Sequence, residues 1–179
     1  MPVRKALAYS KKPARPYTRK SSTKSKSYIK TIPPQKIVKL RMGNQKAFES
    51  SEYKYIVRLL SSENIQIRDL ALEASRQYVN KALDTELPGQ YFFELKVYPH
   101  HIIREHKVLT GAGADRMAIG MAHSFGVTIG RAARVKKGDE IFLIAVPTEK
   151  AMRQAIHFLR QVKSKLPCAC SISVEIKKA

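Results

Sequence analysis

The chain has 179 residues and a formal net charge of +20 at pH 7, because 34 lysines and arginines face only 14 aspartates and glutamates. Its length suits one domain with an extension, and a charge this large predicts a polyanionic partner, with nucleic acid as the first candidate and an anionic membrane surface as the second. The apolar runs are too short to span a membrane, and the N-terminus lacks the apolar core of a signal peptide, so we expect a cytoplasmic location. Of the two candidate partners we expect nucleic acid and no membrane.

Residues 1–35 differ in composition from the rest of the chain. They carry ten lysines and arginines, five prolines and no acidic residue. Such a segment cannot bury enough apolar surface to order itself, so we expect an extended tail that takes its shape from RNA, with rings stacking on bases and cations meeting phosphates. The alternative is a targeting or merely solubilising tail. The residues predicted to bind RNA are Arg4, Lys5, Lys11, Lys12, Arg15, Tyr17, Arg19, Lys20, Lys24, Lys26 and Lys30, together with Arg131 and Arg134 further along the chain.

The folded part, residues 36–179, is expected to be a single domain that begins with two short strands. Residues 36–41 and 53–59 have strand-like composition, and the alternation of Tyr53, Tyr55, Val57 and Leu59 predicts one buried face for the second strand.

The first long helix is predicted at residues 65–83, with Ser62 or Asn64 as its N-cap. Its expected outer face carries Asp69, Glu73, Arg76 and Asn80. The residues expected to form its buried stripe are Ile67, Leu70, Ala71, Ala74, Tyr78 and Ala82.

A long connection at about residues 99–117 follows a predicted strand at 91–97. Five of the eight glycines lie in this connection or just after it, and a short helix is expected at 114–124. Loops this long inside a compact domain are usually functional or disordered, and glycines beside cations suit the close approach of a backbone to a polyanion. The alternative is a surface loop that is basic only because the whole protein is basic.

The C-terminal part is expected to contain a hairpin, a helix and a final strand. Residues 127–135 and 140–146 read as its two arms, and the second arm is apolar on both faces, which predicts a central strand covered on both sides. A helix at 149–166, capped by Thr148, and a strand at 171–176 complete the chain. These elements predict an α+β fold, namely a two-layer α/β sandwich with a mixed, mostly antiparallel sheet, two main helices and a basic N-terminal extension.

The histidines and cysteines match no metal or catalytic signature. His100, His101 and His106 lie among cations that would oppose a metal ion, and His157 is expected on the outer face of its helix. Cys168 and Cys170 have neither the zinc nor the redox spacing, so we expect reduced thiols. The sequence therefore predicts neither a metal nor another cofactor.

The glycine-rich run at 111–116 is likewise no nucleotide-binding motif. It lacks the third glycine of a dinucleotide fingerprint, and no Gly-Lys-Ser/Thr follows it as in a phosphate-binding loop. We expect no small-molecule substrate and no enzymatic activity.

Three stretches together resemble one family. They are residues 32–44, which end in Met-Gly-Asn; residues 99–105, Pro-His-His-Ile-Ile-Arg-Glu; and residues 111–117, Gly-Ala-Gly-Ala-Asp-Arg-Met. Across nearly its whole length the chain resembles the family of large-subunit ribosomal protein ten of archaea and eukaryotes, the counterpart of bacterial large-subunit protein sixteen. It departs from the family pattern at Arg41, where an acid is common, and at residues 127–128, where Lys-Pro is usual.

This resemblance implies a structural protein of the cytoplasmic ribosome, of archaeal type, that binds large-subunit rRNA and neighbouring ribosomal proteins and supports subunit assembly. It also implies a position beside A-site tRNA, which would be a transient partner, with the long loop directed toward the peptidyl-transferase centre. The alternatives are an RNA-modifying or tRNA-acting enzyme and a non-ribosomal basic protein that binds nucleic acid. The loop residues expected to face tRNA and the peptidyl-transferase centre are Arg104, His106, Lys107, Gly111, Gly113, Asp115 and Arg116.

Overall fold

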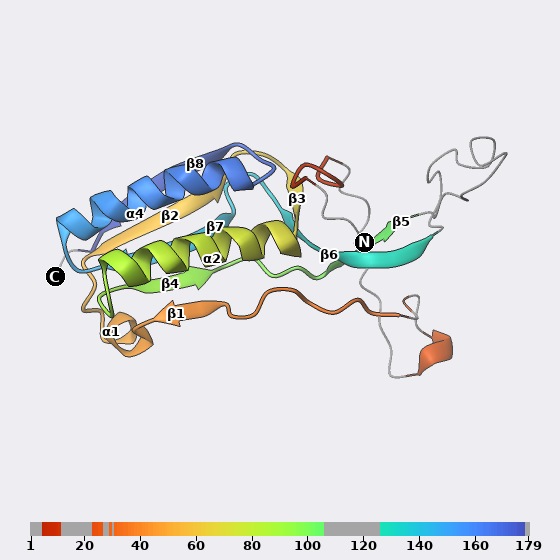
Figure 1. The fold of residues 1–179 in the computed structure, drawn as a ribbon, viewed down its shortest axis with the longest axis horizontal. Coiled ribbons are helices and arrows are strands. Elements are labelled where there is room, and N and C mark those ends of the chain that lie inside the picture. Colours follow the sequence, from red (N-terminus) through yellow and green to blue (C-terminus); the bar gives the residue numbers. More distant parts are fainter. Residues whose placement is uncertain (1–4, 12–22, 27–28, 30, 106–125, 178–179) are drawn as a thin grey trace.

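The computed structural model describes residues 5–11, 23–26, 29, 31–105 and 126–177, which form two antiparallel sheets packed with helices (Figure 1). The larger sheet consists, in spatial order, of β1 (Arg41–Gly43), β4 (Phe92–Leu95), β7 (Glu140–Val146), β2 (Tyr55–Ser61) and β8 (Cys170–Ile176). The smaller sheet consists of β3 (Ile65–Arg68), β6 (Val127–Val135) and β5 (His101–Glu105), also in spatial order. The predicted α+β class is confirmed, with two sheets in place of one.

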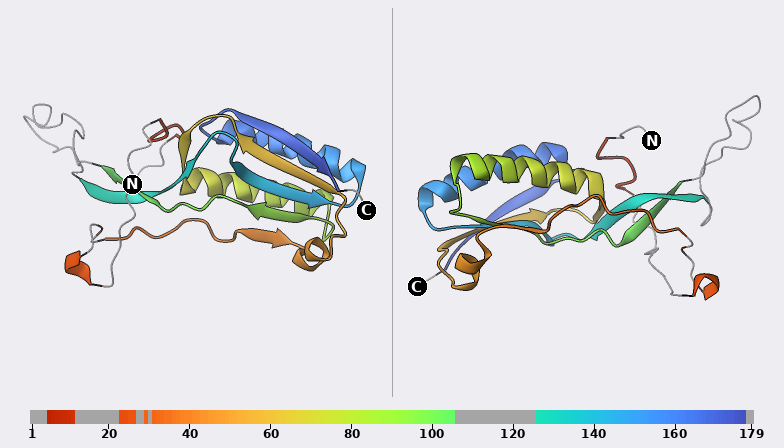
Figure 2. Two further views of the ribbon diagram at one scale, coloured as in Figure 1. Left: turned by 180° about the vertical axis from the view of Figure 1, so that it is seen from behind. Right: turned by 60° about the horizontal axis from the view of Figure 1, so that its bottom comes forward.

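Two long helices cover one face of the larger sheet. Helices α2 (Asp69–Glu86) and α4 (Glu149–Val162) lie side by side above the strands, and the short helix α1 (Gln45–Glu49) lies on the opposite side (Figure 2). Thr148 accepts a hydrogen bond at its side chain from the backbone N–H of Ala151, so the predicted cap of α4 is confirmed. A 3₁₀ turn, Lys163–Lys165, follows α4, and a second one spans Lys24–Lys26.

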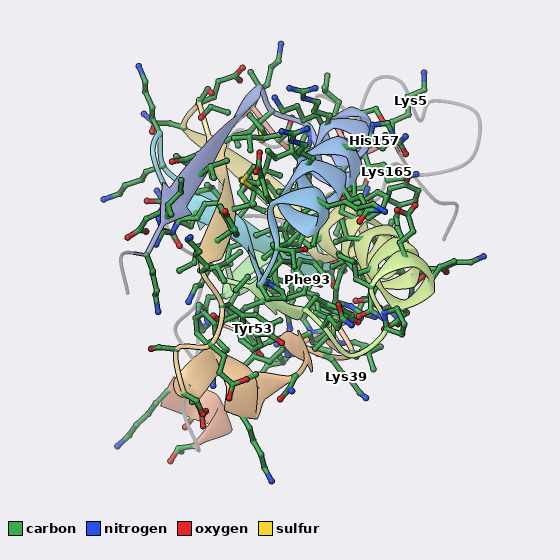
Figure 3. The ribbon with its side chains drawn as sticks, turned by 90° about the vertical axis from the view of Figure 1, so that its left-hand side faces the viewer. Lys5, Lys39, Tyr53, Phe93, His157 and Lys165 are labelled. Carbon is green, nitrogen blue, oxygen red and sulfur yellow. The ribbon has the colours of Figure 1, made fainter. Side chains whose placement is uncertain are left out.

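The main core lies between the larger sheet and the two long helices. Phe93 lies in this interior, whereas His157 and Lys165 lie at the surface (Figure 3). A second cluster lies on the other face of the sheet, where the rings of Phe48 and Phe92 stack with centroids 4.2 Å apart. Residues 141–146 of β7 are all buried between the two clusters, which confirms the predicted central strand.

The smaller sheet continues the three inner strands of the larger one. The order β4-β7-β2 in the larger sheet is repeated as β5-β6-β3 in the smaller sheet, and each strand passes directly from one sheet to the other (Figure 1). The predicted hairpin of residues 127–135 and 140–146 is therefore wrong. β6 pairs with β3 and β5, whereas β7 pairs with β2 and β4. We call the smaller sheet the β-arm.

Hydrogen bonds that join the end of β2 and the β2–β3 connection to the β6–β7 connection hold the bend at which the β-arm leaves the larger sheet. The N–H of Ser61 donates to the carbonyl of Asp139 at 3.0 Å, and the N–H of Gly138 donates to the carbonyl of Ser61 at 2.8 Å. Gly138 has φ +91°, a conformation that suits glycine, and the N–H of Lys137 donates to the side-chain oxygen of Asn64 at 2.9 Å. Residues 136–139 thus form a bend between sheets and not the turn of a hairpin.

The predicted helix at 65–83 begins four residues too early. Ile65 and Ile67 belong to β3 and pair with β6. The prediction failed here because the spacing of these two residues fits a strand as well as a helix. The helix starts at Asp69, and its buried face is centred on Leu72, Val79 and Leu83. Of the predicted stripe on the helix, Ala71 is buried and Tyr78 and Ala82 pack against the core, whereas Leu70 and Ala74 are exposed. Asp69, Glu73 and Arg76, expected outside, are all buried.

The start of the domain also differs from the predicted strand at 36–41. Residues 36–40 are irregular, and β1 contains only Arg41–Gly43. Helix α1 was not predicted, although Asn44 caps it by accepting a hydrogen bond from the N–H of Ala47. The helix predicted at 114–124 lies outside the described residues.

A buried ion pair ties the segment around β1 to helix α2. Arg76 donates to both carboxylate oxygens of Glu73, at 2.6 and 2.8 Å, and its other nitrogen donates to the sulfur of Met42 at 3.0 Å. The N–H of Val38 also donates to Glu73, at 3.4 Å. These contacts, chiefly the hydrogen bond from Arg76, hold the pKa of Glu73 below its ordinary value of 4.5.

This lowered pKa predicts acid-sensitive stability. The unfolded chain binds a proton at Glu73 more readily, so the stabilisation is complete above the ordinary pKa and is lost as the pH falls below 4.5. Glu73→Gln should cost about 1–3 kcal/mol at neutral pH and should make the acid-induced loss shallower. Urea unfolding between neutral and acidic pH measures both effects, with the exposed Glu49→Gln as control. Identical pH profiles for Glu73→Gln and the parent would contradict the assignment.

The buried face of α4 can be tested in the same way. Leu159 is fully buried, so Leu159→Asp places an unpaired carboxylate in the core and should cost several kcal/mol, on the order of the whole stability of a domain. His157→Asp puts the same side chain on the exposed side of the helix and serves as the control. Circular dichroism melting should show a cooperative transition for the control only. A cooperatively folded Leu159→Asp protein would show that the face is wrong.

Candidate nucleic-acid interface

The two faces of the β-arm differ in chemistry. Strand pairing aligns Arg68 and His101 with Ala132, and aligns Gln66 with Arg134, so these side chains share one face. The opposite face carries Ile65, Ile67, Ala133 and Val135, which belong to the main core. We call the first the polar face and the second the core face.

His101 is buried on the polar face between cations. Its side chain is 6% exposed, and burial together with the nearby Arg134 and Arg104 lowers its pKa below the ordinary value of 6.5. The imidazole is therefore neutral at neutral pH, and the positive charge of this face comes from its arginines. No group of three His, Cys, Asp or Glu side chains that could hold a metal ion occurs among the described residues.

The described N-terminal residues lie against the polar face. The backbone N–H of Gln66 donates to the carbonyl of Ser10 at 3.2 Å, and the Gln66 side-chain amide donates to the carbonyl of Tyr9. The hydroxyl of Tyr9 donates to Glu105 at 2.5 Å, and the Arg68 guanidinium lies 6.0 Å from the centre of the Tyr9 ring. Residues 5–11 thus contact both outer strands of the β-arm, β3 and β5.

The far end of the core face carries Arg131 and Arg104. Arg131 is half-buried and donates to the carbonyl of Pro33 at 2.8 Å, while the Thr128 hydroxyl donates to the carbonyl of Thr31 at 3.1 Å. Alternation along β5 places Arg104 on the same side as Ile102, whose register partner is Arg131. The β-arm therefore has arginines on both faces, and Arg131 also secures residues 31–35.

The structure separates the predicted site residues into three groups. Arg131 and Arg134, predicted together, lie on opposite faces of β6, and Arg134 is exposed. Lys5, Lys11 and Lys26 are exposed, and Lys24 belongs to a 3₁₀ turn. The predicted residues that lie outside the described part of the chain are Arg4, Lys12, Arg15, Tyr17, Arg19, Lys20, Lys30, His106, Lys107, Gly111, Gly113, Asp115 and Arg116.

Several residues of this surface were missed in the sequence. The sequence predicts residues 101–105 as part of the long loop, whereas in the structure they form β5, which pairs along β6 with a bulge after Ile103. The place of Arg68 on this surface was not predicted, because the sequence favours a helix at the residues that form β3. The role of Tyr9 depends on contacts with residues 57 or more positions away, so no local signal could have revealed it.

The outer face of α4 is a weaker candidate for binding phosphates. His157, Arg153 and Arg160 are exposed as expected. However, Arg153 pairs with Glu149 at 2.7 Å, and the surface hollow beside His157 is also lined by Glu86 and Glu149. The carboxylates there oppose a polyanion.

The two cysteines lie close together. Cys168 and Cys170 are free thiols with sulfur atoms 3.5 Å apart, and the hydrogen bond from Cys170 lowers the pKa of Cys168.

Among the helices of the described residues, none is both long and apolar enough to cross a membrane.

Comparison with known proteins identifies the family. The sequence profile of the family "Ribosomal protein L16p/L10e" matches residues 13–173. A Large ribosomal subunit protein uL16 of Methanococcus maripaludis is 44% identical over 177 residues, which cover 97% of this chain and 95% of the relative. The proteins of the same name from Hyperthermus butylicus and Halobacterium salinarum are 42% and 39% identical, covering 97% and 93% of this chain and 94% and 95% of those relatives. The chain therefore belongs to the L16p/L10e family of ribosomal proteins, as the three stretches of its sequence predicted.

Proposed function

We propose that this chain is a structural, non-enzymatic constituent of the large ribosomal subunit in the cytoplasmic ribosome, and that its β-arm and N-terminal segment bind large-subunit rRNA. Membership of the L16p/L10e family supports the ribosomal role. The observation that carries the RNA-binding surface is the β-arm itself, which places arginines on both of its faces. Neighbouring ribosomal proteins are the other expected partners.

The distribution of acidic groups supports the β-arm as the RNA-binding surface. The carboxylate of Glu94 in the larger sheet pairs with Arg41 at 2.7 Å and with Lys96 at 2.5 Å. Arg58 likewise pairs with Glu140 at 3.0 Å and with Glu175 at 2.5 Å. In contrast, the strands of the β-arm contain four arginines and a single acid, Glu105. Positive charge is therefore in excess at the β-arm, where a phosphate backbone gains most from it.

The N-terminal tail of residues 1–35 is proposed to extend the same surface. Its ten lysines and arginines meet no acid within the segment, and the described Lys5, Lys11 and Lys26 are exposed. The described residues near both ends of the tail contact the β-arm: Tyr9 and Ser10 accept hydrogen bonds from Gln66, and Pro33 accepts one from Arg131. The cations of the tail are therefore proposed to act together with those of the β-arm. The combination makes a binding surface that is long and mainly electrostatic.

The β-arm is also proposed to direct the predicted loop, at about residues 106–115, toward A-site tRNA and the peptidyl-transferase centre. Strands β5 and β6 are neighbours in the β-arm, and the chain runs from the end of β5 to the start of β6 through residues 106–125. Arg104 lies one residue before the end of β5, directly after the bulge in its pairing with β6, so a paired strand can position its guanidinium. A planar guanidinium grips phosphate in a fixed orientation, which a lysine does not reproduce.

RNA binding should depend strongly on salt. If about 6–10 phosphates are contacted, affinity for large-subunit rRNA should fall by about 10³–10⁵ between 50 and 200 mM salt. Arg134→Ala should reduce the logarithmic salt slope by about 1, whereas Arg160→Ala on α4 should leave it unchanged. Filter binding over a salt series measures both slopes. A flat titration, or equal effects of the two variants, would contradict the proposed surface.

The loop should act in translation and not in folding. Arg104→Ser should change the melting temperature little, because Arg104 is half-buried in the next-to-last position of β5, and substitutions away from the core usually change stability by within about 0.5 kcal/mol. The same variant should impair peptide synthesis when it is incorporated into large subunits, and deletion of residues 107–113 should impair it more. Thermal unfolding and translation rates are measured in parallel. If ribosomes that carry the deletion translate at the parental rate, the loop is only a surface connection.

A further inference from the structure

We propose that Tyr9 is a positioning residue that fastens the N-terminal segment to the polar face of the β-arm, so that residues 5–11 and the β-arm form one preorganised surface for the RNA phosphate backbone. This inference rests on the proposed function, because it assigns the tail and the β-arm to a single RNA-binding unit. The sequence alone describes the tail as an independent extension.

Contacts with both outer strands of the β-arm converge on Tyr9. Its carbonyl accepts a hydrogen bond from the side-chain amide of Gln66 in β3, and its hydroxyl donates to Glu105 in β5 at 2.5 Å. The Arg68 guanidinium lies 6.0 Å from the centre of the Tyr9 ring, within the range of a cation–π contact. One side chain thus spans the β-arm from β3 to β5.

The backbone next to Tyr9 is held as firmly as its side chain. Ser10 is fully buried, its carbonyl accepts from the N–H of Gln66 at 3.2 Å, and its hydroxyl donates to the carbonyl of Leu7 at 2.7 Å. Tyr9 has φ +64°, an uncommon conformation for a residue other than glycine. Such a conformation persists only where surrounding contacts determine it, which is what Gln66, Arg68 and Glu105 provide.

Anchoring changes what the tail cations can do. Lys5 and Lys11 lie on either side of Tyr9 in the sequence, and both are exposed. Because the segment between them is fixed to the β-arm, these cations are held close to the arm that carries Arg68 and Arg134. Preorganisation of this kind raises affinity by reducing the entropy lost on binding. Tyr9 therefore contributes to RNA affinity although it carries no charge.

The experiment compares Tyr9→Ala and Tyr9→Phe in the full-length protein. Tyr98→Phe is a matched control, because the Tyr98 hydroxyl also donates to a side chain, that of Gln35, at a different place. Hydrogen exchange of residues 5–11 and 101–105 is measured in the free protein, and affinity is measured for a transcript of archaeal large-subunit rRNA. Thermal unfolding confirms that each variant is folded.

We expect Tyr9→Ala to speed exchange in both segments and to weaken RNA binding by about tenfold, which is within the range of coupled contacts. Tyr9→Phe should give a smaller effect, and Tyr98→Phe none in these segments. The Lys11→Ala effect on affinity should shrink in the Tyr9→Ala background, because an unanchored lysine is no longer preorganised. Unchanged exchange, or equal Lys11→Ala effects in the two backgrounds, would overturn the inference.

The outcome for Arg134→Ala separates this inference from the proposed function. If Arg134→Ala weakens RNA binding and Tyr9→Ala does not, the β-arm binds RNA but Tyr9 is no positioning residue. If neither variant weakens binding, the proposed RNA surface itself is wrong. Exchange in the free protein tests the anchor without any RNA.

Discussion

The structure depends on one geometric constraint, the bend that three strands make as they leave the larger sheet. Strands β4, β7 and β2 continue as β5, β6 and β3 in the same spatial order. Hydrogen bonds that join Ser61 to Gly138 and Asp139 hold this bend. Since only three to five residues separate each strand from its continuation, the core face of the β-arm joins the main core, whereas its polar face does not. The bend thereby connects a cationic arm to the larger sheet.

The distribution of charge also differs between the β-arm and the rest of the protein. In the body of the protein, acidic side chains are matched by cations, as in the buried pair of Glu73 and Arg76 and in the pairs around Arg58 and Glu94. This pairing satisfies the charges of Glu73, Arg76 and Glu94, which are buried and would otherwise cost several kcal/mol each. The strands of the β-arm carry four arginines and one acid, Glu105. We therefore propose that folding and RNA binding use different sets of charges.

The sequence predicted those elements whose signals are local. Strand β7 was recognised because both of its faces are apolar, and α4 because Thr148 and a helical stripe define it. The pairing of β6 and β7 was wrong because strand partners depend on non-local contacts, and a sharp bend has the same residues as a hairpin turn. Ile65 and Ile67 fit either a strand or a helix, so the start of α2 and its buried face were misplaced.

The same distinction applies to the candidate site. The predicted strand at 127–135 already implies that Arg131 and Arg134 lie on opposite faces, but the hydrogen bond from Arg131 to the carbonyl of Pro33 is non-local and only the structure shows it. Arg68 and Tyr9 could not be found without β3. The family, in contrast, was predicted correctly from three short stretches, because their residues identify the family even where the pairing of the strands cannot be read from the sequence.

The most direct test of the account is a cryo-EM reconstruction of archaeal large subunits that have been depleted of their own L16p/L10e protein and rebuilt with this chain. The account predicts rRNA phosphates within hydrogen-bonding distance of Arg134 and Arg68 on the polar face of the β-arm, with residues 5–11 held between Gln66 and Glu105. A reconstruction in which the polar face is exposed to solvent while rRNA packs on the outer face of α4 would contradict it.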